Sequence, residues 1–264
     1  MDARKSREKA FHDQQYREVA YWQAVDKYYT ITDVRVRFWD DFLRRRSPGR
    51  RVLEYGCGRG NYSLQLAGYG ARVTGIDLSE TAMQQAQAVA RARAVPIEFR
   101  VMDGEALDFD DQTFDVICGN AILHHLDLQR SYAEVARTLK PDGVAIFMEP
   151  LGHNLLINLH RRMTPELRTP DEHPLRVRDI ALARSYFETV EVHAFHLLSL
   201  LAVPLRRTPI FPQVLAVLDR VDTFLFARVP LTRRNAWYAV VVLRGPRPRA
   251  GQAGQAGRRV IDGD

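Results

Sequence analysis

Between residues 51 and 150, short apolar runs follow one another with amphipathic stretches of helical spacing between them. The runs and stretches occupy, in order, residues 51–56, 61–70, 71–77, 79–94, 97–103, 114–120, 128–140 and 143–150. The short runs are apolar on both faces, which is typical of strands in a parallel sheet that helices cover on both sides. The sequence therefore predicts an α/β fold with a doubly wound, mostly parallel sheet.

The flanking segments predict how the rest of the chain is organised. Residues 1–49 have the pattern of an amphipathic helical cap with clustered aromatic side chains, and a Ser-Pro-Gly sequence ends it. Residues 246–264 are of low complexity and cannot bury a core, so we expect them to be disordered. One α/β domain is thus expected over residues 50–245.

Two further strands are expected late in this domain, at residues 189–195 and 237–245. Between them lies an apolar helical insertion at about 197–230, which several prolines interrupt. Its side chains either form plain core, or line a lipophilic site or contact a membrane surface, with Arg206, Arg207, Arg233 and Arg234 at the rim. The apolar patch at 195–205 is shorter than the roughly 20 residues that a bilayer span requires.

Net charge and cysteine content narrow the possible partners. The formal net charge is +6 and the pI is about 9.5, but residues 1–10 and 245–264 each contribute two of the six charges. The body is therefore close to neutral, and we expect no nucleic-acid partner. Two cysteines, Cys57 and Cys118, indicate no disulfide framework. The charged N-terminus has no apolar signal region, so we expect a cytoplasmic location.

Residues 53–61, with the sequence LEYGCGRGN, place glycines at 56, 58 and 60 after the acidic Glu54. A glycine-rich turn after a first strand lets the backbone approach a nucleotide-like ligand, because no Cβ intrudes. A Walker loop would need Lys followed by Ser or Thr, which this stretch lacks. A dinucleotide fingerprint would need glycine where the chain has Asn61. A nicotinamide-dependent reductase stays open at this point, and titration with NADH would test it.

Acidic residues end the next two predicted strands. Asp77 follows the glycines by about 20 residues, where a carboxylate accepts the hydroxyls of a ribose. That position suits NAD as well as other adenosine ligands. Asp103 ends the third strand, where a side chain can meet the amino group of adenine. Together the two positions indicate an adenosine-containing ligand.

Five stretches in this order resemble the motifs of the class I S-adenosylmethionine-dependent methyltransferases, in particular the methyltransferase type 11 group. They are LEYGCGRGN, GIDLS, MDGEALDF, FDVICGNAILHHL and TLKPDGVAIF, within residues 50–150. The resemblance implies a Rossmann-like sheet of seven strands whose last two form an antiparallel edge. It also implies S-adenosylmethionine as the cofactor, with Glu54 near its amino group, Asp77 at the ribose and Asp103 at adenine.

The resemblance carries further cofactor contacts onto this chain. They are expected at Gly56, Cys57, Gly58, Asn61, Leu78, Gly104, Glu105 and Asn120. A separate prediction concerns Tyr28 and Tyr29, which either fold over the cofactor as a lid or pack on the sheet. A protein that binds the cofactor without catalysis also fits these residues, because they report binding and not chemistry.

Catalytic candidates follow the fourth and fifth strands. Transfer to a hydroxyl or amine near neutral pH calls for a general base, for which histidine is suited. His125, Glu149 and His153 fall at the carboxyl edge of the sheet, where such folds bind ligands. Alternatively, these side chains hold their loops by hydrogen bonds. No group of His, Cys and Asp shows metal-ligand spacing, so no metal site is predicted.

The residues after the fourth strand also bear on the acceptor. They read GNAIL, without the Asn/Asp-Pro-Pro-aromatic motif of enzymes of this fold that methylate exocyclic amines of nucleic acids. With the apolar insertion, this favours methylation of a small, mostly apolar metabolite, at oxygen. The acceptor and the oligomeric state are left open.

Overall fold

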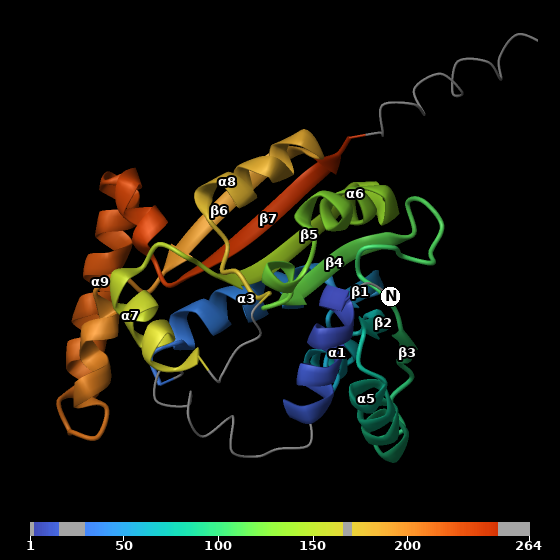
Figure 1. Cartoon of the computed structure of the whole chain (residues 1–264), viewed down its shortest axis with the longest axis horizontal. Coiled ribbons are helices and arrows are strands. Elements are labelled where there is room, and N and C mark those ends of the chain that lie inside the picture. Colours follow the sequence, from blue (N-terminus) through green and yellow to red (C-terminus); the bar gives the residue numbers. More distant parts are fainter. Residues whose placement is uncertain (1–2, 16–29, 166–170, 248–264) are drawn as a thin grey trace, which may run out of the picture.

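Seven strands form one sheet in the computed structural model, which describes residues 3–15, 30–165 and 171–247 (Figure 1). The strands are β1 (Arg51–Tyr55), β2 (Arg72–Asp77), β3 (Glu98–Val101), β4 (Phe114–Asn120), β5 (Leu139–Pro150), β6 (Phe187–Phe195) and β7 (Tyr238–Pro246). Their order is β3-β2-β1-β4-β5-β7-β6. Strand β7 runs antiparallel to both β5 and β6, whereas the other neighbouring strands pair in parallel. The predicted fold class is confirmed, with β6 and β7 as the antiparallel edge.

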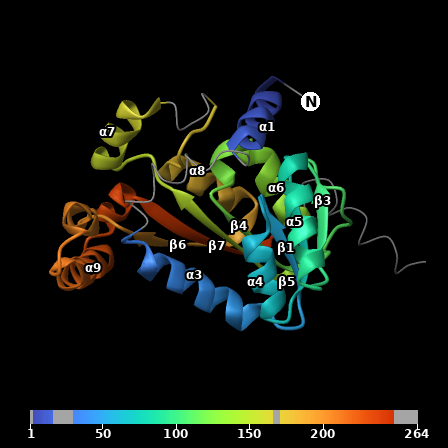
Figure 2. The ribbon, with the colours of Figure 1, turned by 90° about the horizontal axis from the view of Figure 1, so that it is seen from below.

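Helices cover both faces of the sheet (Figure 2). They are α1 (Ala3–Gln15), α3 (Asp33–Arg46), α4 (Asn61–Gly68), α5 (Glu80–Ala92), α6 (Leu128–Thr138), α7 (Leu155–Met163), α8 (Val177–Leu182) and α9 (Phe211–Arg228). Short 3₁₀ turns are η1 (Leu123–His125), η3 (Ala183–Ser185), η4 (Ser199–Leu205) and η5 (Pro230–Asn235). Helices α3, α4 and α5 pack on one face, and α6 and α8 pack on the other.

Packing on both faces explains why the strand segments are apolar without alternation. In β1, Val52 belongs to the same cluster as Trp39 of α3, whereas Leu53 packs in the cluster of Tyr132 from α6. Both strand residues have no exposed surface. Each such side chain contributes about 1.5–3 kcal/mol by leaving water, so both faces stabilise the sheet.

Most predicted boundaries agree with the structure to within a few residues. Ser79 caps α5 as expected, since its hydroxyl accepts the N–H of Ala82 at 3.0 Å. One difference lies at β5, which begins at Leu139 instead of residue 143 because Leu139 already pairs with Phe114 of β4. The helix before it, α6, correspondingly ends at Thr138.

The apolar insertion is helical, as predicted, and consists of η4, α9 and η5. A buried carboxylate joins its parts: Asp222 of α9 accepts backbone N–H groups of Leu197, Leu198 and Ser199 at 2.7–3.1 Å. Within the described residues, no helix combines the length and apolarity needed to cross a bilayer. The expected lid residues Tyr28 and Tyr29, and nearly all of the tail at 246–264, lie outside the described residues.

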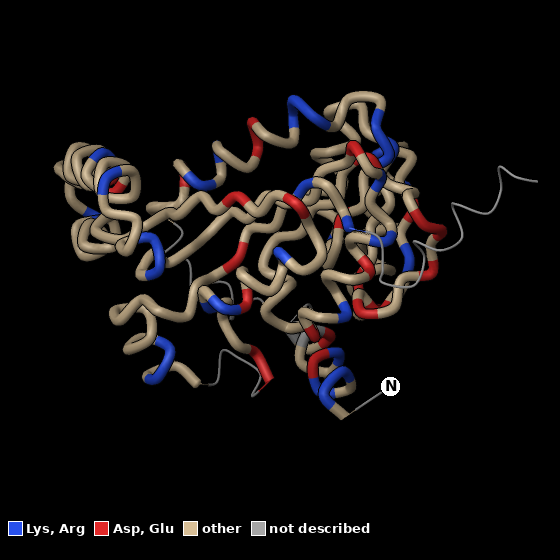
Figure 3. The backbone as a smooth tube through the Cα atoms, turned by 90° about the horizontal axis from the view of Figure 1, so that it is seen from above, with Lys and Arg blue, Asp and Glu red and all other residues tan. Residues whose placement is uncertain are grey.

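Charged residues of both signs are interspersed over the described chain (Figure 3). Helix α1 itself carries both, with Arg4 and Lys5 followed by Glu8. This distribution agrees with a body close to neutral.

Candidate functional site

A cavity of about 570 Å³ opens at the carboxyl ends of the parallel strands. Strands β1 and β4 are neighbours in the sheet, but the helices that follow them lie on opposite faces: α4 follows β1 on one face, and α6 follows β4 on the other. Such a divergence leaves a crevice at the strand ends, which is where open α/β sheets bind ligands. The cavity is lined by the loops after β1, β2, β3 and β4, by α1, and by residues of α7 and β7.

The glycine turn after β1 needs glycine for both conformation and space. Gly56, Gly58 and Gly60 have φ angles of +68°, +50° and +73°. A Cβ on Gly56 would lie 2.6 Å from the Ile122 side chain, and one on Gly60 would lie 2.7 Å from the ring of Phe99. Larger residues would therefore displace the loop after β4 or the strand β3. Asn61 follows as the first residue of α4 and lines the cavity.

Glu54 lies beneath this turn, near the end of β1. Glu54 is 5% exposed, and its carboxylate accepts a hydrogen bond from the hydroxyl of Ser63. Burial raises the pKa of Glu54 to about 8, despite the opposing effect of that hydrogen bond. A ligand with a positive charge would favour the ionised form, so the site is suited to an ammonium group.

Asp77 ties the glycine turn to the start of α5. Its Oδ2 accepts the N–H of Gly58 and its Oδ1 accepts the N–H of Ser79, each at 2.9 Å. Asp77 also lines the cavity, where a carboxylate can meet the hydroxyls of a diol. Leu78 and Cys57 line the cavity beside it, and burial raises the pKa of the Cys57 thiol well above its usual range.

Asp103 and Gly104 lie at the end of β3 and also line the cavity. Asp103 Oδ1 accepts the N–H of Glu105 at 2.9 Å. A Cβ on Gly104 would lie 2.9 Å from the ring of Tyr55, whose hydroxyl donates to the Gly104 carbonyl. Backbone and carboxylate together therefore provide donors and acceptors for the edge of a planar base.

Glu105, predicted to flank adenine, is directed away from the cavity. Its side chain is 1% exposed, accepts the N–H of Asp127 at 2.8 Å, and pairs with Arg4 and with Lys5. Burial alone would raise its pKa, but these hydrogen bonds and charges lower it overall. The residue anchors neighbouring segments to one another, and among the described residues it is not part of the cavity wall.

Helix α1 supplies contacts that the sequence did not reveal. Lys5 Nζ lies 2.5 Å from Asp103 Oδ2 and 2.8 Å from Glu105 Oε2. Glu8, on the next turn, has Oε2 2.9 Å from Nδ1 of His125. Only the charges of this helix were evident in the sequence, because nothing local indicates where an amphipathic helix will dock.

Glu149 holds the loop that follows β4. The Glu149 side chain is fully buried. Its Oε1 accepts the N–H groups of Ile122 and Leu123, at 2.9 and 2.8 Å. Its Oε2 lies 2.7 Å from Nδ1 of His124. Burial raises the pKa of Glu149 to about 7. Because Glu149 does not line the cavity, it positions His124 and does not reach an acceptor there.

Of the remaining predicted site residues, Asn120 and His125 lie in the cavity wall and His153 lies outside it. Asn120, at the end of β4, and His125, whose side chain is 11% exposed, both line the cavity. His153 does not; its Nε2 accepts the N–H of Val177 at 3.4 Å. A catalytic role for His153 stays a prediction that its position does not favour.

The wall opposite the glycine turn comes from segments far along the chain. Ile157, His160 and Arg161 of α7 line the cavity, together with Trp237 and Tyr238 at the start of β7. Ile157, Trp237 and Tyr238 are 5–7% exposed. Sequence reasoning missed these residues, although an aromatic pair opening a strand at the carboxyl end of β5 was a usable signal.

The fold and the cavity together indicate the class of protein to which this chain is similar. A parallel sheet, a glycine turn after the first strand, and carboxylates on β1, β2 and at the end of β3 are features of α/β proteins that bind an adenosine-containing cofactor across their strand ends.

Residues 53–147 match a family model described as a methyltransferase domain. A ubiquinone biosynthesis O-methyltransferase of Coxiella burnetii is 34% identical over 144 residues, which cover 53% of this chain and 60% of the relative. An O-methyltransferase of Penicillium expansum is 34% identical over 133 residues, 48% of each chain. This chain therefore spans about 60% or less of these curated relatives.

One similar solved structure is phosphoethanolamine N-methyltransferase 2 of Haemonchus contortus, in complex with phosphomonomethylethanolamine and S-adenosylhomocysteine. Its TM-score is 0.56 at 20% identity, covering 76% of this chain and 50% of that one. This similarity concerns the fold. Residues 53–147 are thus similar to methyltransferase domains, and S-adenosylmethionine is the cofactor that this similarity leads us to expect. The assignment favours this family over a nicotinamide-dependent reductase.

The residues present fit that cofactor. Its ammonium, ribose diol and adenine amino group call for three acceptors in sequence. Glu54 lies on β1, Asp77 ends β2, and Asp103 follows β3 by two residues, and these three strands are neighbours in the sheet.

Proposed function

We propose that this protein transfers the methyl group of S-adenosylmethionine to an oxygen of a small, mostly apolar acceptor. The observation that carries the proposal is the continuity of the cavity: the carboxylates of Glu54, Asp77 and Asp103 share it with the apolar wall of Ile157 and Trp237. A volume of about 570 Å³ lies within the range of small-molecule sites.

The chain's own residues hold and align the two reactants. S-adenosylmethionine, when bound, supplies an activated methyl group, so the protein contributes mainly alignment and exclusion of water. Glu54 would hold the amino group, Asp77 the ribose and Asp103 the adenine edge. Asn120, the last residue of β4, also lines the cavity.

The acceptor side combines apolar walls with a few polar groups. Trp237, Tyr238 and Ile157 provide surface for an apolar body, while His160 and Arg161 provide polar contacts. Both curated relatives described above are named O-methyltransferases, which supports oxygen as the methylated atom.

A histidine beside this wall would accept the proton of the acceptor hydroxyl. His125 lines the cavity, and His124 does so with its Nδ1 held by Glu149. The contact between Glu149 and Nδ1 orients the His124 ring within the cavity wall. Glu149 then acts as a positioning residue.

An apolar, basic surface supports a second part of the proposal, contact with a membrane surface of anionic lipids. Among the described residues, 11 of the 15 exposed large hydrophobic side chains lie on α7 or between Leu201 and Leu231. Both segments lie at the same end of the molecule (Figures 1 and 2). Residues 201–235 carry six arginines against Asp219 and the buried Asp222. Exposed apolar side chains mixed with arginine match a lipid surface of negative charge.

Calorimetric titration with S-adenosylmethionine, S-adenosylhomocysteine and NADH tests the cofactor assignment. We expect the two sulfur ligands to bind and NADH not to bind. Asp77→Ala should abolish cofactor binding and turnover together, whereas Asp142→Ala, an exposed carboxylate at the opposite edge of the sheet, should change neither. Turnover that persists in Asp77→Ala, or binding of NADH alone, would contradict the assignment. Apolar hydroxylated acceptors can then be screened with labelled cofactor.

A further inference from the structure

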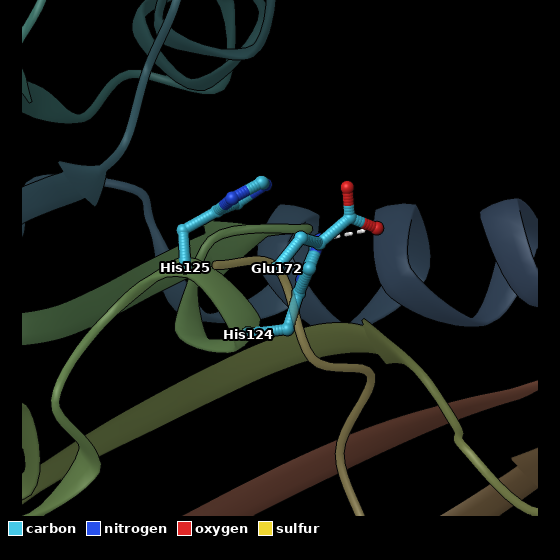
Figure 4. Close-up of side chains that lie close together, drawn as sticks. All are labelled: His124, His125 and Glu172. Carbon is cyan, nitrogen blue, oxygen red and sulfur yellow. Dashed lines mark ion pairs between the residues drawn. The ribbon is translucent and has the colours of Figure 1, made fainter. Parts of the chain in front are cut away.

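Three metal-ligating side chains converge on the cavity wall near the acceptor side (Figure 4). His124 and His125 come from η1, and Glu172 comes from the segment after residue 170. One ligand atom of each lies within 4.8 Å of the others. Their side chains are 5%, 11% and 13% exposed. All three residues line the cavity, so the point at which they converge is accessible to a small molecule inside it.

Each histidine has a carboxylate at its Nδ1. Glu149 Oε2 is hydrogen-bonded to Nδ1 of His124 at 2.7 Å, whereas Glu8 Oε2 lies 2.9 Å from Nδ1 of His125 as an ion-pair contact without hydrogen-bond geometry. In metal sites, a carboxylate at one ring nitrogen fixes the tautomer and the orientation of the imidazole and makes its other nitrogen a better ligand. The second nitrogen of His124, Nε2, lies 3.8 Å from Glu172 Oε1.

The spacing suits a small divalent ion. Metal–ligand bonds of about 2.0–2.2 Å separate neighbouring ligands of a tetrahedral ion by about 3.4 Å. The 3.8 Å between His124 Nε2 and Glu172 Oε1 is close to that value, and modest side-chain rotation would bring the third ligand within it. Two imidazoles and a carboxylate favour Zn²⁺, Fe²⁺ or Co²⁺ over Mg²⁺ or Ca²⁺, which prefer oxygen ligands alone.

We propose that His124, His125 and Glu172 bind a divalent first-row transition metal ion whose open coordination position faces the acceptor. Three protein ligands with one open position are the arrangement of catalytic zinc sites. This proposal rests on the proposed function and replaces its histidine base: with both histidines bound to the ion, a hydroxyl of the acceptor would take the open position, where the ion would lower its pKa. The hydroxyl proton would pass to solvent, the oxygen would form a bond to the methyl carbon, and the bond from that carbon to sulfur would break to leave S-adenosylhomocysteine.

The metal proposal can be tested without turnover. Tag-free protein is stripped with EDTA and titrated with Co²⁺, and visible absorption bands report ions bound by nitrogen and oxygen ligands in low coordination number. We expect one equivalent to bind, and Zn²⁺ to displace it. Glu172→Gln should weaken Co²⁺ binding at least about tenfold, since it removes a ligand of nearly the same shape. Asp171→Asn, which alters the adjacent carboxylate paired with Arg7, is the matched control and should bind Co²⁺ as the parent does.

Two outcomes would overturn the proposal: no Co²⁺ bands in the parent protein, or equal affinity in the parent and in Glu172→Gln. His124→Gln provides a second variant, and its binding of S-adenosylhomocysteine shows whether the fold is kept. Failure here is distinguishable from failure of the proposed function. Cofactor binding and EDTA-resistant turnover without Co²⁺ binding would leave a metal-independent methyltransferase, whereas Co²⁺ binding without cofactor binding would contradict the methyltransferase proposal instead.

Discussion

Lys5 of α1 places its ammonium 2.5 Å from the Asp103 carboxylate, the group that we assign to the adenine edge. The same ammonium lies 2.8 Å from Glu105. Burial would lower the pKa of Lys5, but the two carboxylates raise it overall, so Lys5 is charged. The first helix of the chain is thereby attached to the cofactor end of the cavity.

Removing this attachment should speed release of the cofactor. Charge-assisted hydrogen bonds contribute about 1.5–3 kcal/mol, and part of that stabilises α1 over the cavity. We expect Lys5→Met to raise the dissociation rate of S-adenosylhomocysteine by about 5–30-fold, measured by stopped-flow fluorescence. Arg7→Met, which removes a more exposed ion pair of the same helix with Asp171, should leave that rate within about twofold of the parent value. Equal rates in Lys5→Met and the parent would show that α1 does not cover the bound cofactor.

Cofactor binding should release a proton through Glu54. Its pKa of about 8 leaves the carboxyl mostly protonated at pH 7, and a bound ammonium would favour the carboxylate. Affinity should therefore rise between pH 6 and 7, below the range in which the ligand's own amino group titrates. Calorimetry in buffers of different ionisation enthalpy measures the proton directly. Glu54→Gln should bind more weakly and release none; proton release by that variant would assign the effect to another group.

The raised pKa of Glu54 also predicts how this side chain affects the stability of the folded protein at different pH values. The pKa of Glu54 in the folded protein lies above its usual value of 4.5, so the folded state binds more protons than the unfolded state between pH 4.5 and about 8. Its contribution to the free energy of unfolding is therefore largest at low pH and falls as pH rises through this window. In Glu54→Gln, urea unfolding should depend less steeply on pH over the same window. An unchanged slope would contradict the shifted pKa.

The glycine turn should tolerate a methyl group poorly. In Gly56→Ala, a Cβ at positive φ costs about 1–2 kcal/mol, and the overlap with Ile122 adds about 1–3 kcal/mol. Gly49→Ala is the matched control, because Gly49 also has positive φ (+73°) but open space around its Cβ position. We expect urea unfolding to show the larger loss for Gly56→Ala, together with loss of cofactor binding. Equal losses would assign the requirement to backbone conformation alone.

The apolar, basic surface should carry the protein to anionic vesicles. We expect sedimentation with vesicles of phosphatidylcholine and phosphatidylglycerol, weakened by salt, and little binding to phosphatidylcholine alone. Replacing Leu155 and Leu159, which are 82% and 56% exposed, by Ser should reduce binding several-fold. Val89→Ser, at an exposed position on α5, is the control. If a concentration-dependent dimer forms through this surface instead, sedimentation velocity will detect it and the lipid assignment fails.

The sequence predicted the cavity residues at the strand ends better than those of the opposite wall. Glu54, Asp77 and Asp103 lie in or just after apolar runs and line the cavity, because parallel strands bring their carboxyl ends to one edge. Glu149 satisfies the same rule, yet its side chain lies behind His124, since position along a strand does not determine where a side chain points. Glu172 reaches the cavity wall through long-range packing that leaves no local pattern in the sequence.

Strand β7 lies between β5 and β6 although it is the last strand of the chain. During synthesis, the sheet as far as β5 can assemble before β7 leaves the ribosome, and the cofactor residues are then already in place. The apolar edge strand β5 meanwhile lacks its partner β7, and open edges of this kind pair readily with other chains. The final strand thus does two things at once when it inserts: it closes an aggregation-prone edge and delivers Trp237 to the acceptor wall.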